Sequence, residues 1–120
     1  MKSILIADDS ASMRQMVEFT LRGAGYNVTS CPDGEAASQT AQGQAFDMVL
    51  TDLNMPGKNG IELIRSIRGS GPNATKPIIM LTTESDPEKK QQGKAAGATG
   101  WIVKPFDGDK LIAVVKKVLR

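Results

Sequence analysis

Histidine is absent from the sequence, and cysteine occurs once, at Cys31. A lone cysteine excludes an intramolecular disulfide, and without histidine the chain has neither a His/Cys zinc site nor an imidazole base. Acid–base or metal chemistry must therefore use carboxylates and lysine. Apolar runs are also short: residues 1–9 are too brief for a signal peptide, and no later run could cross a bilayer. We therefore expect a soluble, cytoplasmic protein with no membrane segment.

Aromatic residues make up only 4% of the chain, and the basic residues are scattered without a DNA-reading motif. This composition argues against nucleic-acid binding. The formal net charge of +2 is unevenly placed: residues 1–60 carry four basic and seven acidic side chains, whereas residues 61–120 carry eleven and six. The C-terminal half is thus a candidate docking surface for an acidic partner, although solvated helix faces would give the same pattern.

Five short apolar runs recur along the 120 residues, and each is too short for a buried helix and therefore typical of a strand. They are Ile4–Ala7, Val28–Cys31, Phe46–Thr51, Pro77–Thr82 and Trp101–Val103. Helical patterns separate them, so the connections are too long for hairpins. This alternation predicts one α/β domain with a parallel sheet that helices cover on both faces.

Capping residues and apolar spacing locate the helices. Ser10 is a good N-cap for a first helix that Gly23 and Gly25 end. A fourth helix begins near Pro87 and runs to about Ala96, and it has few large apolar residues. We expect this helix to be weakly held and adjustable in position. The last helix is expected to bury five apolar side chains, namely Leu111, Ile112, Val115, Val118 and Leu119.

Residues with reactive side chains follow four of the five predicted strands. Asp8 and Asp9 come after the first strand, Asp52 after the third, Thr82 at the end of the fourth and Lys104 after the fifth. In parallel sheets of this kind, ligands bind at the carboxyl ends of the strands. We therefore expect three carboxylates, a hydroxyl and an ammonium group to meet at one edge of the sheet.

Such a cluster favours a particular chemistry. Two carboxylates in contact repel each other by about 4 kcal/mol at an intermediate dielectric, so without a cation at least one of them should have a raised pKa. An all-oxygen ligand set suits a hard ion, and Mg²⁺ fits best. With Lys104 and Thr82 nearby, the set is what phosphoryl transfer to Asp52 requires. Taken singly, each residue also has a plain structural interpretation, such as a helix cap, a strand residue or a surface amine.

These residues resemble the receiver domain of two-component response regulators over essentially the whole chain. The matching motifs are Asp8-Asp9, Asp52–Pro56 with Gly60, Thr82, and Lys104–Phe106. Residues 52–56, 60–63 and 101–106 are most similar to the chemotaxis subgroup. The resemblance implies a single receiver domain over residues 1–120 with the flavodoxin-like (βα)5 fold and strand order 2-1-3-4-5.

The resemblance also implies roles for individual residues. Asp52 would be the phosphoacceptor for a histidine kinase, and Mg²⁺ would be held by Asp8, Asp9, Asp52 and the backbone carbonyl of Asn54. Lys104 would pair with the phosphoryl group. Asn54 and Glu84, which stand beside the site, would tune how quickly the phosphoryl group is lost.

Output would depend on Thr82 and Trp101. Thr82 would move toward the phosphoryl group, and the aromatic side chain at position 101 would swing inward and remodel the fourth helix, fifth strand and fifth helix, where partners of this family usually dock. The expected partner is the flagellar motor switch protein or another protein target, with a phosphatase as a further partner. Two departures stand out: Trp101 replaces the usual Tyr or Phe, and the pI near 8.8 is high for a subgroup that is often acidic.

Three other interpretations remain open. A phosphatase of the haloacid dehalogenase type also uses a strand-end aspartate, but those enzymes carry a second aspartate two residues later. Asn54 stands at that position here, and an amide cannot act as a general acid. The chain could instead be a receiver fragment of a longer regulator, or a binding module that acts without phosphorylation.

Overall fold

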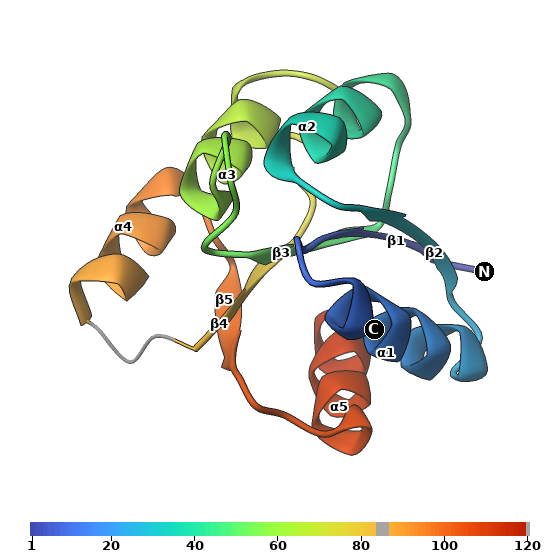
Figure 1. The fold of residues 1–120 in the computed structure, drawn as a ribbon. Coiled ribbons are helices and arrows are strands. Elements are labelled where there is room, and N and C mark those ends of the chain that lie inside the picture. Colours follow the sequence, from blue (N-terminus) through green and yellow to red (C-terminus); the bar gives the residue numbers. More distant parts are fainter. Residues whose placement is uncertain (84–86, 120) are drawn as a thin grey trace.

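The apolar runs form a five-stranded parallel sheet in the computed structural model, which describes residues 1–83 and 87–119. The strands are β1 (Ser3–Ala7), β2 (Asn27–Cys31), β3 (Met48–Asp52), β4 (Ile78–Thr82) and β5 (Gly100–Val103). They lie in the order β2-β1-β3-β4-β5, and each neighbouring pair is parallel (Figure 1). The predicted α/β class and strand order are therefore confirmed.

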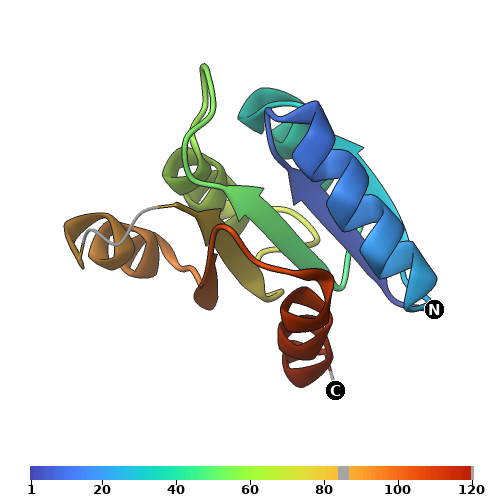
Figure 2. The same ribbon diagram turned by 60° about the horizontal axis from the view of Figure 1, so that its bottom comes forward.

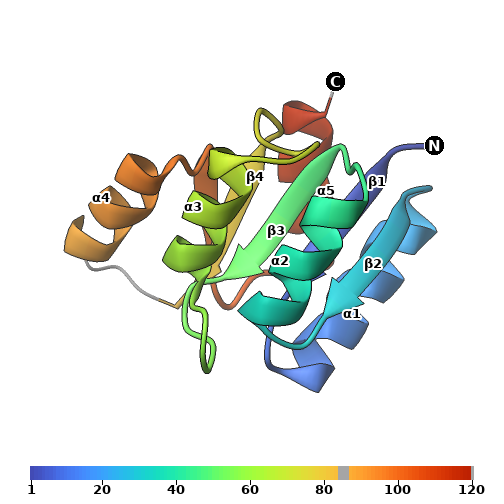
Figure 3. The same cartoon turned by 90° about the horizontal axis from the view of Figure 1, so that it is seen from above.

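Helices cover both faces of this sheet. They are α1 (Ala11–Gly23), α2 (Gly34–Gly43), α3 (Gly60–Gly69), α4 (Pro87–Ala96) and α5 (Gly108–Val118). Helices α1 and α5 lie on one face, and α2, α3 and α4 lie on the other (Figures 1 and 3). Within the described ranges, no helix has the length and apolar character that crossing a bilayer requires.

Each face of the sheet has its own apolar cluster, and β1 contributes to both. Leu5 packs with residues of α2 and α3, whereas Ile4 and Ile6 pack with residues of α1 and α5. Successive side chains of a strand point to opposite faces, so a strand covered on both sides must be apolar throughout. This explains why the strands appear in the sequence as continuous runs of apolar residues.

Side-chain caps begin four of the helices shortly after a strand ends. In each case a side-chain oxygen accepts a hydrogen bond from the backbone N–H three residues later, which satisfies a donor that the helix leaves unpaired. The capping residues are Ser10, Asp33, Asn59 and Asp107. The prediction that Ser10 is an N-cap is confirmed. These short connections keep the carboxyl ends of the strands open at one edge.

The third strand begins later than predicted. Phe46 is buried but stands outside β3, because its N–H donates to the Oδ1 atom of Asn73 at 2.6 Å instead of to a neighbouring strand. The Nδ2 atom of Asn73 donates to the carbonyls of Ala41 and Gln44, both at 2.8 Å. Asn73 thus joins the chain segments that enter β3 and β4.

The last helix buries a slightly different set of side chains from the one predicted. Leu111 and Val115 are buried, and Val118 and Leu119 pack against the same cluster while remaining partly exposed. The prediction of full burial was wrong for Ile112, Val118 and Leu119, which are all partly exposed, and Ile112 does not join the cluster. A residue next to Leu111 is turned about a quarter of the way around the helix, away from the buried stripe.

Helix α4 has few apolar anchors, as predicted. Within this helix, Gly93 is the buried residue. A Cβ atom at Gly93 would lie 2.4 Å from the Sδ and Cε atoms of Met80, so glycine allows the helix to approach β4 closely. A larger residue at this position would meet the flexible end of the Met80 side chain, which would have to shift.

Strand β2 is an edge of the sheet, with β1 on one side only. Asn27 N–H donates to the Lys2 carbonyl, and the Cys31 carbonyl accepts from Asp8 N–H. Hydrogen bonds to one neighbour alternate along a parallel strand, so the backbone groups of Val28 face away from β1.

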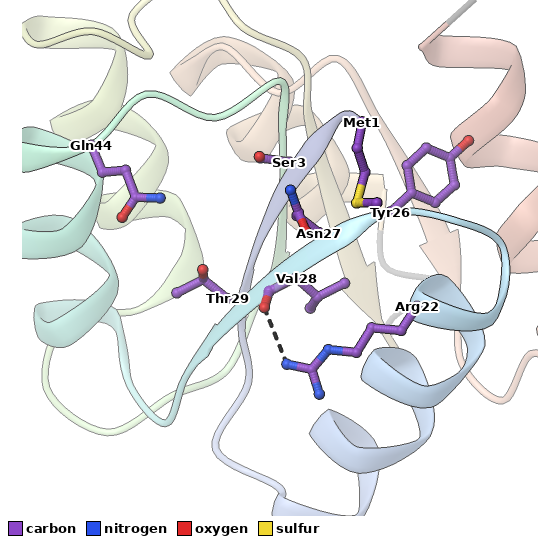
Figure 4. Close-up of a pocket in the computed structure, with 8 residues that line it drawn as sticks. All are labelled: Met1, Ser3, Arg22, Tyr26, Asn27, Val28, Thr29 and Gln44. Carbon is purple, nitrogen blue, oxygen red and sulfur yellow. Dashed lines mark hydrogen bonds between the residues drawn. The ribbon is translucent and has the colours of Figure 1, made fainter.

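Side chains of α1 cover part of this edge. The Nη2 atom of Arg22 donates to the Val28 carbonyl at 3.2 Å, drawn as a dashed line in Figure 4, and lies 3.6 Å from Glu18 Oε1. Glu18 in turn accepts a hydrogen bond from Ser30 Oγ at 2.8 Å. Arg22 also lines an open hollow of about 530 Å³ at the amino ends of β1 and β2, together with Met1, Ser3, Tyr26, Asn27, Val28, Thr29 and Gln44.

Candidate functional site

Three carboxylates meet at the carboxyl ends of β1 and β3, as the sequence predicts. Asp8 and Asp9 follow β1, and Asp52 is the last residue of β3. One oxygen atom from each side chain can be chosen so that all three lie within 4.8 Å of one another. Asp8 is fully buried and Asp52 is 8% exposed, whereas Asp9 is exposed. The cluster is therefore open to solvent on the side of Asp9.

Lys104 places an ammonium group against two of these carboxylates. Its Nζ atom lies 3.1 Å from Asp8 Oδ2 and 3.4 Å from Asp52 Oδ1, and its side chain is only 12% exposed. Lys104 N–H donates to the Thr82 carbonyl at 2.7 Å, which fixes its backbone beside the end of β4. A single ammonium beside three carboxylates leaves the cluster with excess negative charge.

This charge is reflected in the protonation of Asp52. Burial raises the pKa of the Asp52 carboxyl above its ordinary value, Lys104 opposes that rise, and the Asp8 carboxylate adds to it. The ionised form of Asp52 is thus destabilised in this pocket relative to its protonated form, because burial and a like charge both disfavour the charged form. A bound cation would offset that cost.

The donor set fits Mg²⁺. All three ligand groups are carboxylates, which hard cations prefer, and Mg²⁺ commonly uses few protein ligands and keeps several waters. Beside Asp9 lies an open hollow of about 400 Å³ that the loop after β3 also lines, through Asn54, Met55, Pro56, Gly57 and Asn59. Figure 2 shows this loop projecting beyond the tip of the β3 arrow. Through this hollow, water can reach the Asp9 side of the carboxylate cluster.

The remaining predicted site residues lie in different surroundings. Asn54 is exposed on the loop after β3, and Thr82 is 1% exposed at the end of β4, the strand next to β3. Trp101 does not join the carboxylates: its side chain is 41% exposed on β5, and Lys90 Nζ lies 5.2 Å from its ring centroid. Glu84 lies outside the described residues.

Three residues support the site in ways that were not predicted. Arg14 donates from Nη1 to the Asp8 carbonyl at 2.7 Å, and Ser10 N–H donates to Asp8 Oδ1 at 2.9 Å, so both fix the turn that presents Asp8. Gly60 packs against the end of β3, where a Cβ atom would lie 2.3 Å from the Asp52 carbonyl. Gly60 was visible in the sequence as part of a motif, whereas nothing in the sequence marks Arg14.

The fold and the site together define a class: a doubly wound α/β domain with an acidic pocket and a lysine at the carboxyl edge of its sheet. Residues 4–116 match the model of the response regulator receiver domain, and the chain belongs to this family. Receiver domains are phosphoacceptor signalling modules and not metabolic enzymes. They bind Mg²⁺ at an acidic pocket and interact with histidine kinases and downstream targets.

Individual relatives differ in how much of their length this chain matches. Chemotaxis protein CheY-3 of Vibrio cholerae is 39% identical over 116 residues, which cover 96% of this chain and 89% of that protein. Response regulator ArlR of Staphylococcus saprophyticus is 38% identical over 120 residues, but the chain spans only 53% of its length. The solved structure of Vibrio cholerae CheY4 is 48% identical, covers 99% of both chains and superposes with a TM-score of 0.95.

Proposed function

We propose that residues 1–120 form one receiver domain that acts as a phosphorylation-dependent switch, with Asp52 as the phosphoacceptor. One observation carries the proposal: the nearly buried Asp52 carboxylate lies against the Lys104 ammonium and within the Asp8 and Asp9 cluster. A carboxylate in these surroundings is a suitable nucleophile, because the groups that would stabilise a phosphoryl group are already in place. The donor is a histidine kinase or a small phosphorylated molecule.

The chemistry is an in-line displacement at phosphorus. A carboxylate oxygen of Asp52 forms a bond to phosphorus as the bond from phosphorus to the donor breaks, which leaves an acyl phosphate on Asp52. The Lys104 ammonium and the Thr82 hydroxyl donate to the phosphoryl oxygens. Asp8, Asp9, Asp52 and the backbone carbonyl of Asn54 would hold Mg²⁺. When bound, Mg²⁺ neutralises charge on the carboxylates and the phosphoryl oxygens.

The phosphoryl group is retained long enough to signal. Hydrolysis in phosphatases that use an aspartate nucleophile needs a general acid or base two residues further on, and Asn54 cannot supply one. This supports a phosphoacceptor with slow autodephosphorylation instead of a turnover enzyme. Asn54 and Glu84 are proposed to set the rate of that loss.

Output passes through the α4-β5-α5 face to a protein partner. This face carries Trp101 beside Lys90, together with the exposed Val103, so it offers both charge and apolar surface to an acidic partner. We propose that phosphorylation draws Trp101 inward and repositions α4. The close match to nearly the full length of CheY-3 supports a cytoplasmic role in chemotaxis, with the flagellar motor switch as the target.

A second candidate is the receiver portion of a longer regulator. The comparison with ArlR favours this candidate, because the chain matches only about half of the length of that regulator. In that case the partner of the α4-β5-α5 face would be a domain of the same protein. The phosphorylation chemistry would be unchanged.

Intact-protein mass after incubation with acetyl phosphate and Mg²⁺ tests the central claim. We expect a single phosphoryl adduct that EDTA prevents and that the Asp52→Asn variant lacks. Asp109→Asn is the matched control, because Asp109 is an acidic residue in the first turn of α5, away from the carboxylate cluster. It should form the adduct as the wild type does.

The outcomes separate the proposed functions. Failure of the wild type to form an adduct would exclude the phosphorylation switch and leave a binding module that acts without phosphate. An adduct that persists in Asp52→Asn would place the acceptor elsewhere. Partner binding that is the same in wild type and Asp52→Asn, with and without the donor, would also favour the unphosphorylated module.

A further inference from the structure

The loop between β3 and α3 carries Asn54 and leaves the sheet after Leu53, whose N–H donates to the Leu81 carbonyl at 3.3 Å. Gly60 N–H closes the loop by donating to the Leu53 carbonyl at 3.0 Å, and Met55 is buried against the α2 and α3 side of the core. Gly57 has φ = +72°, a conformation that glycine adopts readily. Asn54 and Pro56 are exposed. A loop of this kind needs further contacts if it is to present one carbonyl in a fixed direction.

Lys58 supplies a side-chain contact to helix α2. Its Nζ atom donates to Ser38 Oγ at 3.3 Å and lies 3.9 Å from Glu35 Oε2. Ser38 is 5% exposed and shares a 2.8 Å hydrogen bond with Ser66 on α3. The Glu35 contact contributes little, because that carboxylate is 65% exposed. The bond to the buried Ser38 is the anchor.

The backbone of Lys58 also meets α2 directly. A Cβ atom at Gly34, the first residue of α2, would lie 2.0 Å from the Lys58 carbonyl oxygen. The start of α2 is itself fixed, because Asp33 accepts a 2.7 Å hydrogen bond from Ala36 N–H. The loop therefore rests on a rigid helix end at one point through its main chain and at a second through the Lys58 side chain.

We propose that Lys58 is a positioning residue that braces the β3–α3 loop on α2 and thereby orients the Asn54 carbonyl toward Mg²⁺. This inference rests on the proposed function, because it concerns the metal site of the phosphoacceptor. Groups that orient a metal ligand typically change metal affinity by tenfold or more when they are removed. Lys58 has this effect through loop geometry and touches neither metal nor phosphate.

The effect of Lys58 on Mg²⁺ affinity has opposite signs if the residue acts through its charge and if it positions the loop, which makes the proposal testable. Removing a positive charge near an acidic pocket strengthens the attraction of that pocket for a cation. If Lys58 acted only through its charge, Lys58→Met would therefore bind Mg²⁺ more tightly. If Lys58 positions the loop, the same variant binds Mg²⁺ more weakly.

Titration of ¹⁵N-labelled protein with Mg²⁺, followed by amide chemical shifts, measures this affinity without any phosphorylation. We expect the Kd for Mg²⁺ to rise about tenfold in Lys58→Met and to stay within about twofold of wild type in Lys58→Arg, which keeps a donor that can reach Ser38. Lys2→Met is the matched control, because it removes the same charge from an exposed lysine at the amino end of β1. Its Kd should equal that of wild type.

Ser38→Ala tests the brace from the helix side and guards against misfolding of the lysine variant. It should weaken Mg²⁺ binding alone but have no further effect when combined with Lys58→Met. Equal or tighter binding in Lys58→Met, or additive effects of the two substitutions, would overturn the proposal. If wild type itself binds no Mg²⁺ and forms no adduct with acetyl phosphate, the proposed function fails instead.

Discussion

The clearest test of how this fold is held together is the substitution Asn73→Ala. Asn73 is 1% exposed, and its amide makes three hydrogen bonds: one from Phe46 N–H and two to the carbonyls of Ala41 and Gln44. Alanine removes all three partners at once. The Phe46 N–H and the two carbonyls then lose their side-chain partner in a mostly buried position.

The cost can be worked out from those groups. An unsatisfied buried donor costs about 1 to 3 kcal/mol, and each carbonyl that loses a partner adds about 1 kcal/mol, so the free energy of unfolding should fall by about 3 to 5 kcal/mol. For a domain of this size, the Tm should fall by roughly 10 to 20 °C. Total stability of a domain of this length is of order 10 kcal/mol, so the variant should still fold at low temperature.

Urea denaturation followed by circular dichroism measures the loss, with Asn27→Ala as the matched control. Asn27 is exposed, so its variant should lie within about 0.5 kcal/mol of wild type. Asn73→Asp should be at least as unstable as Asn73→Ala, because a carboxylate oxygen would face the Ala41 and Gln44 carbonyls. A loss below about 1 kcal/mol in Asn73→Ala would refute the reasoning, since it would mean that the freed groups find other partners.

Three further predictions concern the site and its output. The pKa of Asp52 is raised in the folded state above its ordinary value of 3.8. The free energy of unfolding of the wild type should therefore fall as the pH rises from 3.8 through the raised pKa, because the folded state holds the proton more tightly than the unfolded state. Asp52→Asn should therefore be more stable than wild type at pH 7 without Mg²⁺, and urea titrations should show the difference shrinking toward pH 3.8 and on adding Mg²⁺. Gly60→Ala should cost about 1 to 3 kcal/mol in urea titrations and slow adduct formation with acetyl phosphate, because its Cβ would collide with the Asp52 carbonyl; unchanged values would contradict the packing. Lys90→Met should alter Trp101 fluorescence and its quenching by acrylamide, because the ammonium no longer lies over the indole. Loss of this cation–π contact, worth about 0.5 to 1 kcal/mol, should favour inward movement of Trp101 on phosphorylation. An unchanged fluorescence spectrum would contradict the contact.

Much of the site could be predicted because it is assembled from strand ends. Once Asp8, Asp52 and Lys104 are each assigned to the end of a parallel strand, the sheet itself brings them to one edge. The order of the strands was a different matter. Continuous apolar runs carry no register signal, since both faces of each strand are buried, and so the order came from family resemblance and not from the strand pattern.

Features that depend on contacts between distant segments could not be predicted. Asn73 looks like an ordinary loop residue, and nothing nearby in sequence shows that it meets Phe46. Lys58 likewise looks like a loop lysine until the start of α2 is placed beside it. The burial of Ile112 was predicted wrongly for a simpler reason. The last helix is so rich in apolar residues that their spacing alone does not show which of them face the core.

The contact between Arg22 and the Val28 carbonyl affects whether a further strand from another chain can pair with the edge strand β2. An uncovered edge strand is a template on which another chain can add, which is the first step of strand-by-strand polymerisation. Here an added strand would first have to displace the guanidinium from its acceptor. Arg22 thus occupies one backbone acceptor on the open edge of β2 that an added strand would otherwise use.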